Sequence, residues 1–573
     1  MSRLTRAGRG MVIKTFESLQ DMKSFDKFKD GEVVHLVSWH LGKSLGSGDF
    51  VVSKTSTATG DDGYIVVADD GTRLTRVITG NLYADMWGAL PSSTYNSYNA
   101  IKAAYAYAYS VNTQLFLAGG HYVMKGATSI DINPTRAGIS SLARCFIDAS
   151  GMTSDYVFTI SSESSYAPAP YNNNLNTALQ GLYVYGNKTA GVSGLLCGKR
   201  VASSTKSYNG QTEIRDCTFD KFDYNIRMGH NSWRFVFWKV NSLNALNANG
   251  ILYIPSGLDD SGEIMSFYHC QFFDGSGSNI RLSCNSYCLI FNTCSFLNIT
   301  FYNDAGNSTT VTCNGCNFEN PGSTSTRRYV DITAGHTHVF TINGGTIVTN
   351  RNGGQTQALF NVSANNQLNF CNLTIPYGAH YQQETETGYH GFVSGEGSVT
   401  TSGCMLQLNN GAGCCPLHPS LSNYENWNLS YGDTSGWTVN KGAGTTSLVE
   451  VLSGLGPKGE HVLHVAPVSH GVNISQVTRV EGVGGFSLSL MVNIISASAS
   501  ASAGQISVTY LSESDKSLGG VSANIGTTTG WRVIGKTTLR GRLPIGTKKL
   551  RLNIQTVAGA SVYYTNILSN VIK

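Results

Sequence analysis

Hydrophobic and polar positions alternate in different ways along the 573 residues of the chain. Residues 16–28 have helical spacing, whereas residues 32–39 and 49–53 alternate as strands do. This mixture predicts a small head domain, which we place at residues 1–84. Residues 96–109 then form an Ala- and Tyr-rich helical segment, which precedes a short apolar strand at residues 114–117 and a turn at Gly119 and Gly120.

From about residue 180, short apolar strands alternate with turns rich in Asn, Gly and Ser. A loose four-residue box with apolar second and fourth positions recurs at steps of 21 to 35 residues. Stacked coils with three short strands each and loops of variable length produce this spacing. The repeat therefore predicts a parallel β-helix, with its capping helix, over residues 85–420. The boxes begin at Gly181, Asp216, Phe237, His269, Thr293, Gly315, Gly344, Phe370 and Gly403.

The second position of the box is expected to point into the coil, because alternate residues of a strand face opposite sides. Cysteine suits such a position as a small buried hydrophobe. We therefore expect a structural stack of cysteines there, not disulfides or metal ligands, and we interpret Cys313 in the same way. Trp238 occupies the second position of its box and is expected in the core. The cysteines at this position are Cys217, Cys270, Cys294, Cys316 and Cys371.

The repeat stops between residues 415 and 430, and longer alternating strands follow at 486–492, 505–510, 531–536 and 549–554. Strands of this kind, separated by Gly/Ser turns, predict an antiparallel β-sandwich of jelly-roll type over residues 421–573, with a loop at 496–503. The whole chain is thus expected to be all-β. Four aromatic residues could form a sugar platform in the sandwich, although core packing is expected for most of them: Trp427, Tyr431, Trp437 and Trp531.

Charged residues make up only 13% of the chain, and its formal net charge is +4. No Lys/Arg block follows the first dozen residues, so we expect no nucleic-acid partner. Neither an eighteen-residue apolar run nor an apolar N-terminal stretch is present, which predicts synthesis in a cytoplasm and no membrane insertion. No phosphate-binding loop or zinc-binding helix motif occurs, and we expect neither a cofactor nor a metal.

Several segments resemble a known family. Residues 85–126, which begin with a D-x-x-G-A motif at Asp85, resemble the opening of the right-handed, pectate-lyase-like β-helices of phage tailspikes. Residues 231–234, Gly262-Glu263 and residues 267–270 resemble coils of capsule depolymerases from Klebsiella phages, and residues 12–16 and 46–50 resemble their head domain.

This resemblance covers most of the chain. It implies a homotrimeric spike on the virion, made in the host cytoplasm, that binds and cuts capsular polysaccharide at the bacterial surface. The sandwich would contribute carbohydrate binding or trimerisation. As a further hypothesis, the head docks onto another tail protein.

Hydrolysis of a glycosidic bond needs two carboxylates, one as acid and one as base or nucleophile. The densest acidic group of the repeat region, Asp259, Asp260 and Glu263, lies in one long insertion between coils, and the resemblance favours Glu263. Asp220 and Asp223 follow the second box and form another candidate pair. Asp220 comes after an inward phenylalanine and is therefore expected to point outward, where it could share a face with the insertion.

The residues around these carboxylates predict substrate contacts. Trp233 could stack on a sugar ring. If the polymer contains uronic acids, elimination would need a neutraliser and a base, which Arg227 or Arg234 with His230 or Tyr268 could supply. The residues leave hydrolase and lyase chemistry open, and a pure polysaccharide-binding adhesin is the rival function. A secreted cellular enzyme is disfavoured because the sequence has no export signal.

Overall fold

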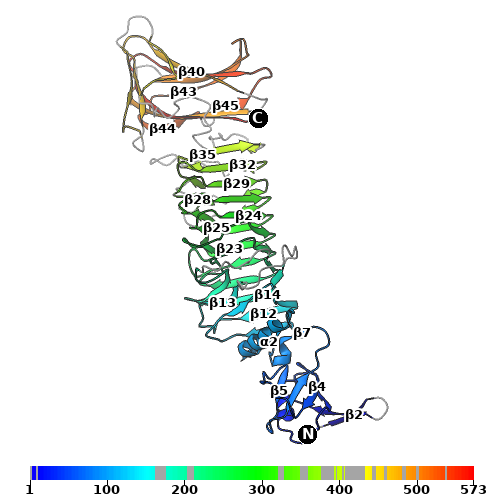
Figure 1. Ribbon diagram of the computed structural model, residues 1–573. Helices are drawn as coiled ribbons and strands as arrows, with labels where there is room; N and C mark the ends of the chain where they lie inside the picture. Colours follow the sequence, from blue (N-terminus) through cyan, green and yellow to red (C-terminus); the bar gives the residue numbers. More distant parts are fainter. Residues whose placement is uncertain are drawn as a thin grey trace. The chain divides into compact units, whose positions relative to one another are not determined.

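The computed structural model describes the chain in two compact units, residues 1–313 and 314–573. It is all-β apart from two α-helices and a short 3-10 helix among the described residues (Figure 1). None of these helices is long and apolar enough to cross a bilayer. The described residues are 3–7, 11–161, 176–202, 212–319, 328–333, 335–348, 359–375, 393–394, 396–402, 405–406, 433–441, 447–456, 461–480, 485–497, 502–535 and 538–572.

Unit 1 begins with the head domain, a six-stranded sheet that packs on helix α1 (Leu19–Lys23). Its core contains Phe16, Val34 and Phe50, all of which are buried. Only the β2–β3 pair is parallel. The predicted head is thus present, with a helix shorter than its apolar spacing suggests. In spatial order the strands are β1 (Arg3–Ala7), β2 (Met11–Phe16), β3 (Val33–Leu36), β4 (Gly48–Ser53), β6 (Arg73–Arg76) and β5 (Ile65–Val67).

Helix α2 (Tyr98–Ser110) lies between the head and the coils in the chain, as predicted. It follows the 3-10 helix η1 (Ala84–Trp87) of the D-x-x-G-A segment. Its buried face includes Ile101 and Tyr105, and the Tyr105 hydroxyl accepts a hydrogen bond from the Asn133 amide at 2.7 Å. The helix therefore covers the apolar interior where the coils begin, and water is kept from the open end of the solenoid.

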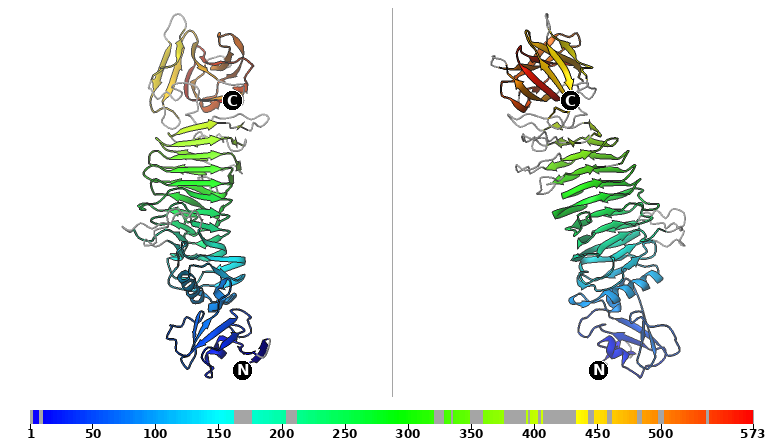
Figure 2. Two further views of the ribbon diagram at one scale, coloured as in Figure 1. Left: turned by 45° about the vertical axis from the view of Figure 1, so that its right-hand side comes forward. Right: turned by 90° about the vertical axis from the view of Figure 1, so that its left-hand side faces the viewer.

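Three parallel ladders form the coils of unit 1, a right-handed β-helix whose stacked strands are visible in Figure 2. The long strands β12, β14, β23 and β25 each contribute to two ladders. The first ladder contains β7 (Leu82–Tyr83), β9 (Leu115–Leu117), β12 (Ile139–Asp148), β14 (Asn176–Thr189), β16 (Thr212–Arg215), β19 (Val236–Trp238), β22 (Met265–Tyr268), β24 (Cys288–Asn292) and β26 (Thr310–Asn314).

The other two ladders run beside the first. The second ladder contains β8 (Ser92–Asn96), β10 (Gly120–Val123), parts of β12 and β14, β17 (Thr218–Phe222), β20 (Asn241–Leu243), β23 (Gln271–Leu282) and β25 (Ser295–Asn303). The third ladder contains β11 (Ile130–Ile132), β13 (Tyr156–Ile160), β15 (Ser193–Cys197), β18 (Ile226–Met228), β21 (Leu252–Ile254) and the later halves of β23 and β25.

From β14 onward, a single left-handed residue makes the corner between the first and second ladders. In unit 1, Asp216, Lys239, His269 and Thr293 have φ of 51°, 51°, 53° and 50°. The backbone amide of Asp216 donates to the carbonyl of Trp238 in the next coil at 2.8 Å. The amide of Lys239 donates in the same way to the carbonyl of Tyr268 at 2.8 Å. Because the chain turns here, the residues just before and just after a corner face opposite sides of the wall.

Aromatic rings stack inside the coils in register with the strands. Phe237, Phe267 and Phe291 are fully buried, and each ring centroid lies 4.6 Å from the next. Cys217 lies in the same interior, and burial raises the pKa of its thiol to about 12. Such a thiol stays protonated at neutral pH and acts as packing material, as expected for the cysteine stack.

Unit 2 contains further coils and the C-terminal sandwich. Its coils have the same three ladders and the same corner, here made by Gly315, Gly344 and Asn372, which all have positive φ. The ladders are β29 (Val339–Asn343), β32 (Gln367–Cys371) and β35 (Ser398–Ser402); β27 (Asn317–Glu319), β30 (Thr346–Val348), β33 (Thr374–Ile375) and β36 (Met405–Leu406); and β28 (Val330–Ile332), β31 (Phe360–Val362) and β34 (Val393–Ser394).

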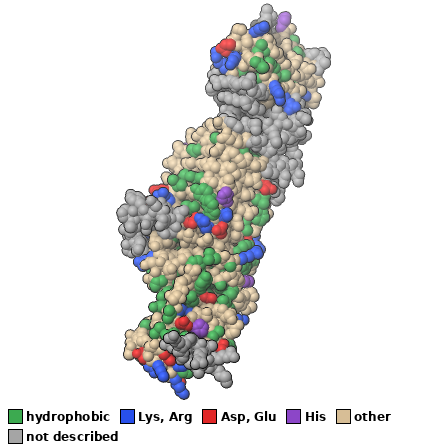
Figure 3. Space-filling model, turned by 90° about the vertical axis from the view of Figure 1, so that its right-hand side faces the viewer, with side chains coloured by type: hydrophobic (Ala, Val, Ile, Leu, Met, Phe, Trp, Pro, Cys, Tyr) green, Lys and Arg blue, Asp and Glu red, His purple; other side chains and the backbone are tan. Residues whose placement is uncertain are grey.

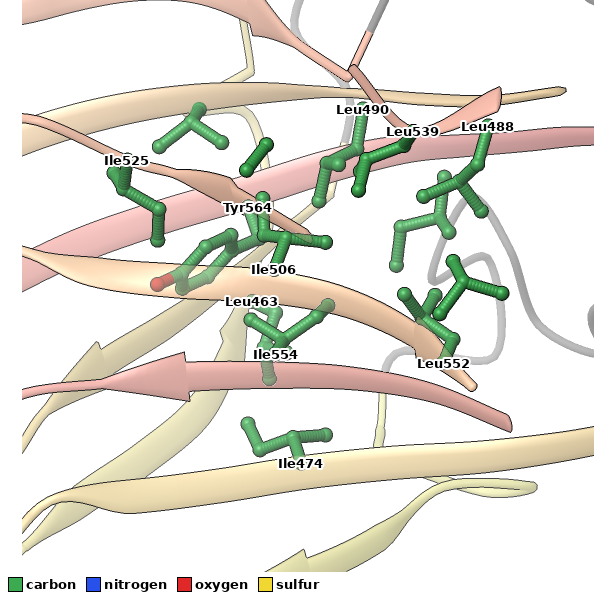
Figure 4. Packing of buried hydrophobic residues seen from close by; sticks show 14 of the residues in the cluster. Leu463, Ile474, Leu488, Leu490, Ile506, Ile525, Leu539, Leu552, Ile554 and Tyr564 are labelled. Carbon is green, nitrogen blue, oxygen red and sulfur yellow. The ribbon is translucent and has the colours of Figure 1, made fainter. Parts of the chain in front are cut away.

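The sandwich consists of two antiparallel sheets, and Figure 4 shows side chains such as Ile474, Leu490 and Tyr564 packed between them. The predicted sandwich is therefore confirmed, and its four predicted strands fall on β41, β42, β44 and β46. One sheet contains β37 (Thr438–Asn440), β40 (Val472–Arg479), β46 (Lys549–Thr556), β42 (Gly504–Leu511) and β43 (Ser517–Asn524). The other contains β38 (Leu448–Leu452), β39 (Val462–Ala466), β47 (Ser561–Ile572), β41 (Gly485–Ser496), β44 (Gly530–Ile534) and β45 (Arg540–Arg542).

The predicted box has the right register at Cys217, Cys270, Cys294 and Cys316, and all four are buried. In two coils the predicted box is shifted by two residues from the observed register. Thr218 pairs with Asn241, so Val240 and not Trp238 is the counterpart of Cys217. Thr346 pairs with Thr374, so Leu373 and not Cys371 occupies that position. Trp238 and Cys371 come before the corner, and both are only half-buried.

Replacement of Phe267 by alanine should destabilise the protein strongly, since it removes the middle ring of the interior stack. A buried Phe→Ala change costs about 3–5 kcal/mol of unfolding free energy. Leu142→Ala, at a side chain that is 76% exposed in the same unit, provides the control. Chemical denaturation followed by fluorescence would measure both variants. Equal midpoints for the two would contradict the stacked interior.

Candidate functional site

A hollow opens between the loops that follow the third-ladder strands of three successive coils. Its lining comes from residues 256–258, 260, 261 and 263 after β21, from 283–286 after β23, and from Asp304 and Gly306 after β25, and its volume is about 650 Å³. Asp260, Glu263 and Asp304 all line it. On the face of the molecule shown in Figure 3, charged side chains are scattered among larger areas of other side chains. The hollow brings three carboxylates together.

The preceding loop holds the acidic insertion in place through backbone hydrogen bonds. The backbone amide of Asn231 donates to the carbonyl oxygen of Asp259 at 2.8 Å, and the amide of Arg234 donates to the carbonyl oxygen of Glu263 at 2.7 Å. In the other direction, the amide of Gly262 donates to the carbonyl oxygen of Ser232 at 2.9 Å. The two loops are therefore stacked like the strands, and the side chains of Asp260 and Glu263 project from a fixed backbone.

His230 holds the start of this insertion. Its Nδ1 accepts a hydrogen bond from the Asp259 amide at 3.1 Å, and the Asp259 carboxylate lies 3.6 Å from the same nitrogen. Both contacts fix the imidazole ring of His230 against the first residues of the insertion.

Asp304 is committed to neighbouring side chains. It accepts from Arg281 Nη2 at 2.5 Å and from Ser283 Oγ at 2.6 Å. Such a charge-assisted pair fixes the carboxylate as part of the wall of the hollow. The exposed carboxylates of Asp260 and Glu263 are better placed for chemistry.

Comparison with known proteins adds three findings. Residues 15–79 match the family model of the phage tail protein small four-stranded β-sheet domain. The chain is 62% identical over 575 residues to the K2-specific capsule depolymerase of Klebsiella phage vB_KpnP_KpV74, with 100% of this chain and 99% of that protein covered. This chain belongs to the phage capsule depolymerase family.

Among solved structures, the enzymatically active domain of tailspike protein 4 from bacteriophage CBA120 superposes with a TM-score of 0.75. The match covers 98% of this chain and 78% of that domain at 17% identity, and it confirms the β-helical tailspike fold of the depolymerase. The resemblance to tailspikes and capsule depolymerases inferred from the sequence is thus confirmed.

The structure brings only some of the predicted carboxylates together. Asp260 and Glu263 share the hollow, and Asp259 lies beside it on His230. Asp220 is outside the hollow and buried. Its carboxylate accepts from the Tyr183 hydroxyl at 2.7 Å and from Asn244 at 3.3 Å.

Asp223 also lies away from the hollow, where it accepts from the Gly191 amide at 3.2 Å. Both Asp220 and Asp223 belong to the second ladder and the turn that follows it, whereas the insertion follows the third ladder. The expectation that Asp220 shares an open face with the insertion is therefore wrong.

The predicted substrate contacts of the depolymerase also lie at different places. Arg234 is exposed and Trp233 half-buried in the loop under Glu263. Tyr268 lies on the outer side of the first ladder, where its ring packs against Trp238 with centroids 5.3 Å apart and planes tilted by 31°. Arg227 lies on the outer side of the third ladder, on the same side of the coil as the strands that lead into the hollow.

The sequence patterns predict neither the place of Asp304 in the hollow nor the outward position of Trp238. The guanidinium of Arg215 lies 5.7 Å from the centre of the outward Trp238 ring. The sequence does contain a hint of Asp304. When the coils are aligned along their ladders, this residue lies two positions after an outward-facing residue of β25. Of the aromatic residues suggested for a platform in the sandwich, Trp437 is buried and Trp531 half-buried, whereas Trp427 and Tyr431 lie outside the described residues.

Replacement of His230 by alanine should loosen the start of the insertion. The loss of one hydrogen bond worth about 1 kcal/mol predicts a roughly fivefold faster hydrogen exchange at the Asp259 amide. His230→Gln, which retains an acceptor oxygen, should restore part of the protection. Mass spectrometry of the peptide that spans residues 256–263 would measure this exchange. An unchanged rate in the alanine variant would contradict the proposed contact.

Proposed function

We propose that this protein is a tailspike that binds the capsular polysaccharide of its host and cleaves bonds within the polymer at the hollow formed by Asp260 and Glu263. The observation that carries the proposal is the pair of exposed carboxylates on a clamped loop of a full-length relative of a capsule depolymerase. A solenoid suits a linear polymer because its coils offer a long lateral surface on which sugar units can lie in succession.

Hydrolysis is the chemistry that this arrangement favours. Glu263 would protonate the glycosidic oxygen, and Asp260 would act as the second carboxylate, either on water or on the anomeric carbon. Asp304, paired with Arg281, would keep the hollow polar without donating a proton. Asp259, turned toward His230, would position the backbone of the insertion.

Two other functions make different predictions. A lyase would use Arg234 to neutralise a uronate and His230 or Tyr268 as base, and its product would carry an unsaturated sugar. An adhesin would bind the capsule and leave its length unchanged. The proposed catalytic pair distinguishes both alternatives from a hydrolase, because neither depends on two carboxylates in the hollow.

The remaining parts of the chain fit a role in the virion tail. The head matches a phage tail domain, which supports attachment to another tail protein. We propose a homotrimer, as the resemblance to phage tailspikes implies. We propose carbohydrate binding or trimerisation for the sandwich, and we propose synthesis in the host cytoplasm. Light scattering after gel filtration would test the trimer, and a monomer at all concentrations would contradict it.

Glu263→Gln and Asp260→Asn should each lower the rate of capsule cleavage by about 10²–10⁴-fold, because each removes one member of an acid–base pair. Purified capsules of several serotypes, incubated with each variant and analysed by size-exclusion chromatography and mass spectrometry, provide the measurement. A hydrolase should release oligosaccharides that have gained one water per cleaved bond and carry a saturated sugar at the new non-reducing end.

Asp216→Asn is the matched control. It makes the same carboxylate-to-amide change at an exposed corner of unit 1, where asparagine tolerates a positive φ. This variant should cleave at the wild-type rate. Full activity in Glu263→Gln or an unsaturated product would overturn the hydrolytic assignment.

A further inference from the structure

The outer side of the third ladder carries a column of arginines and tyrosines. Arg227 pairs with Tyr253, Tyr253 with Arg281, and Arg281 with Tyr302 in successive coils. Their strand neighbours, such as Ile226 and Met228, are buried, so these four side chains face outward. Neighbouring strands lie about 4.8 Å apart, so the column presents alternating cationic and aromatic groups at regular spacing.

Direct contacts hold the column together. The rings of Tyr224 and Tyr253 are stacked, with centroids 5.1 Å apart and planes 21° apart. The Arg227 guanidinium lies 5.6 Å from the first ring centre and 5.5 Å from the second. One coil further on, the Arg281 guanidinium lies 5.3 Å from the Tyr302 ring. The side chains are therefore ordered before any ligand arrives, which lowers the entropic cost of binding.

The arginines along this side differ in how their charge is balanced. Arg200 forms an ion pair with Asp155 at 3.1 Å, and Arg281 forms one with Asp304 at 2.5 Å. Arg227 contacts the rings of Tyr224 and Tyr253, and within the described ranges it has no carboxylate at ion-pair distance. A half-buried guanidinium without a counter-charge favours an anion from outside the chain.

The column also borders the hollow. Tyr253, Arg281 and Tyr302 stand on the strands β21, β23 and β25, whose following loops supply the lining of the hollow. Arg281 links the two directly, since its partner Asp304 is one of the lining residues. A polymer that passes over the column would therefore meet Asp260 and Glu263 where it leaves the strands.

We propose that Arg227, with Tyr224, Tyr253, Arg281 and Tyr302, forms a subsite that binds an acidic sugar unit of the polysaccharide next to the cleavage point. Arg227 binds the carboxylate of that unit, while the tyrosine rings pack against sugar rings. The inference rests on the proposed function and extends it, because it identifies an acidic polymer as substrate and Arg227 as the residue that selects it.

The test uses an acidic capsular polysaccharide that the wild-type protein cleaves and the same polysaccharide after chemical reduction of its carboxyl groups to alcohols. Arg227→Ala should raise KM on the native polymer about tenfold or more, with kcat nearly unchanged, since a charge-assisted contact outside the reacting bond is lost. Wild-type protein on the reduced polymer should show a similar rise. Arg227→Ala on the reduced polymer should show no additional rise.

Two further variants complete the design. Arg227→Lys, which keeps the charge but not the planar fork, should retain part of the affinity. Lys221→Ala is the matched control, because it removes a cation that lies 5.3 Å from the Tyr185 ring in the same coil but on the second ladder. Its KM should equal that of the wild type. Thermal denaturation of each variant would show that the fold is intact.

The possible outcomes separate this inference from the proposed function. Equal effects of Arg227→Ala on native and reduced polymers would overturn the carboxylate contact while leaving depolymerase activity intact. A wild-type protein that cleaves only neutral capsules would overturn the acidic substrate. A wild-type protein that cleaves no capsule in the panel would instead overturn the proposed function.

Discussion

The structure depends on vertical stacking of equivalent side chains between coils. Each coil is too short to bury its own apolar residues, and it does so only against its neighbours. Stacked phenylalanine rings at 4.6 Å and buried cysteines fill the interior of unit 1. A left-handed corner residue between the first two ladders repeats from coil to coil, and its amide hydrogen bond to the next coil helps to keep the register. This register therefore sets the positions of the outward-facing side chains and of the loops between the strands.

At the candidate site, the register between coils determines where the loops and their side chains lie. The loops that leave the third ladder lie above one another, and backbone hydrogen bonds join the insertion of residues 256–263 to the loop of residues 229–234. This places Asp260 and Glu263 on a rigid backbone in one hollow, with the Arg281–Asp304 pair as part of its wall. The same register aligns Arg227, Tyr253, Arg281 and Tyr302 on the adjoining strands.

Much of the fold could be predicted from the sequence, because the head, the capping helix, the repeat and the sandwich each have their own period of apolar residues. The apolar pattern misaligns two boxes because the corner breaks the simple alternation of inward and outward residues, and it therefore predicts Trp238 in the core. The acidic insertion was recognisable by its density of carboxylates. The burial of Asp220 was not, because Tyr183 and Asn244 reach it from adjacent coils. Asp304 was overlooked because a lone carboxylate after a strand becomes informative only when coils are aligned.

We infer that the hollow and the adjoining strands bind the polymer across its scissile bond. The most direct measurement is a crystal structure of the Glu263→Gln protein with an oligosaccharide from a capsule that the wild type cleaves. We expect sugar density in the hollow, with the glycosidic oxygen beside residue 263 and continuous density over the third ladder. Density confined to another surface, with the hollow free of sugar, would contradict it.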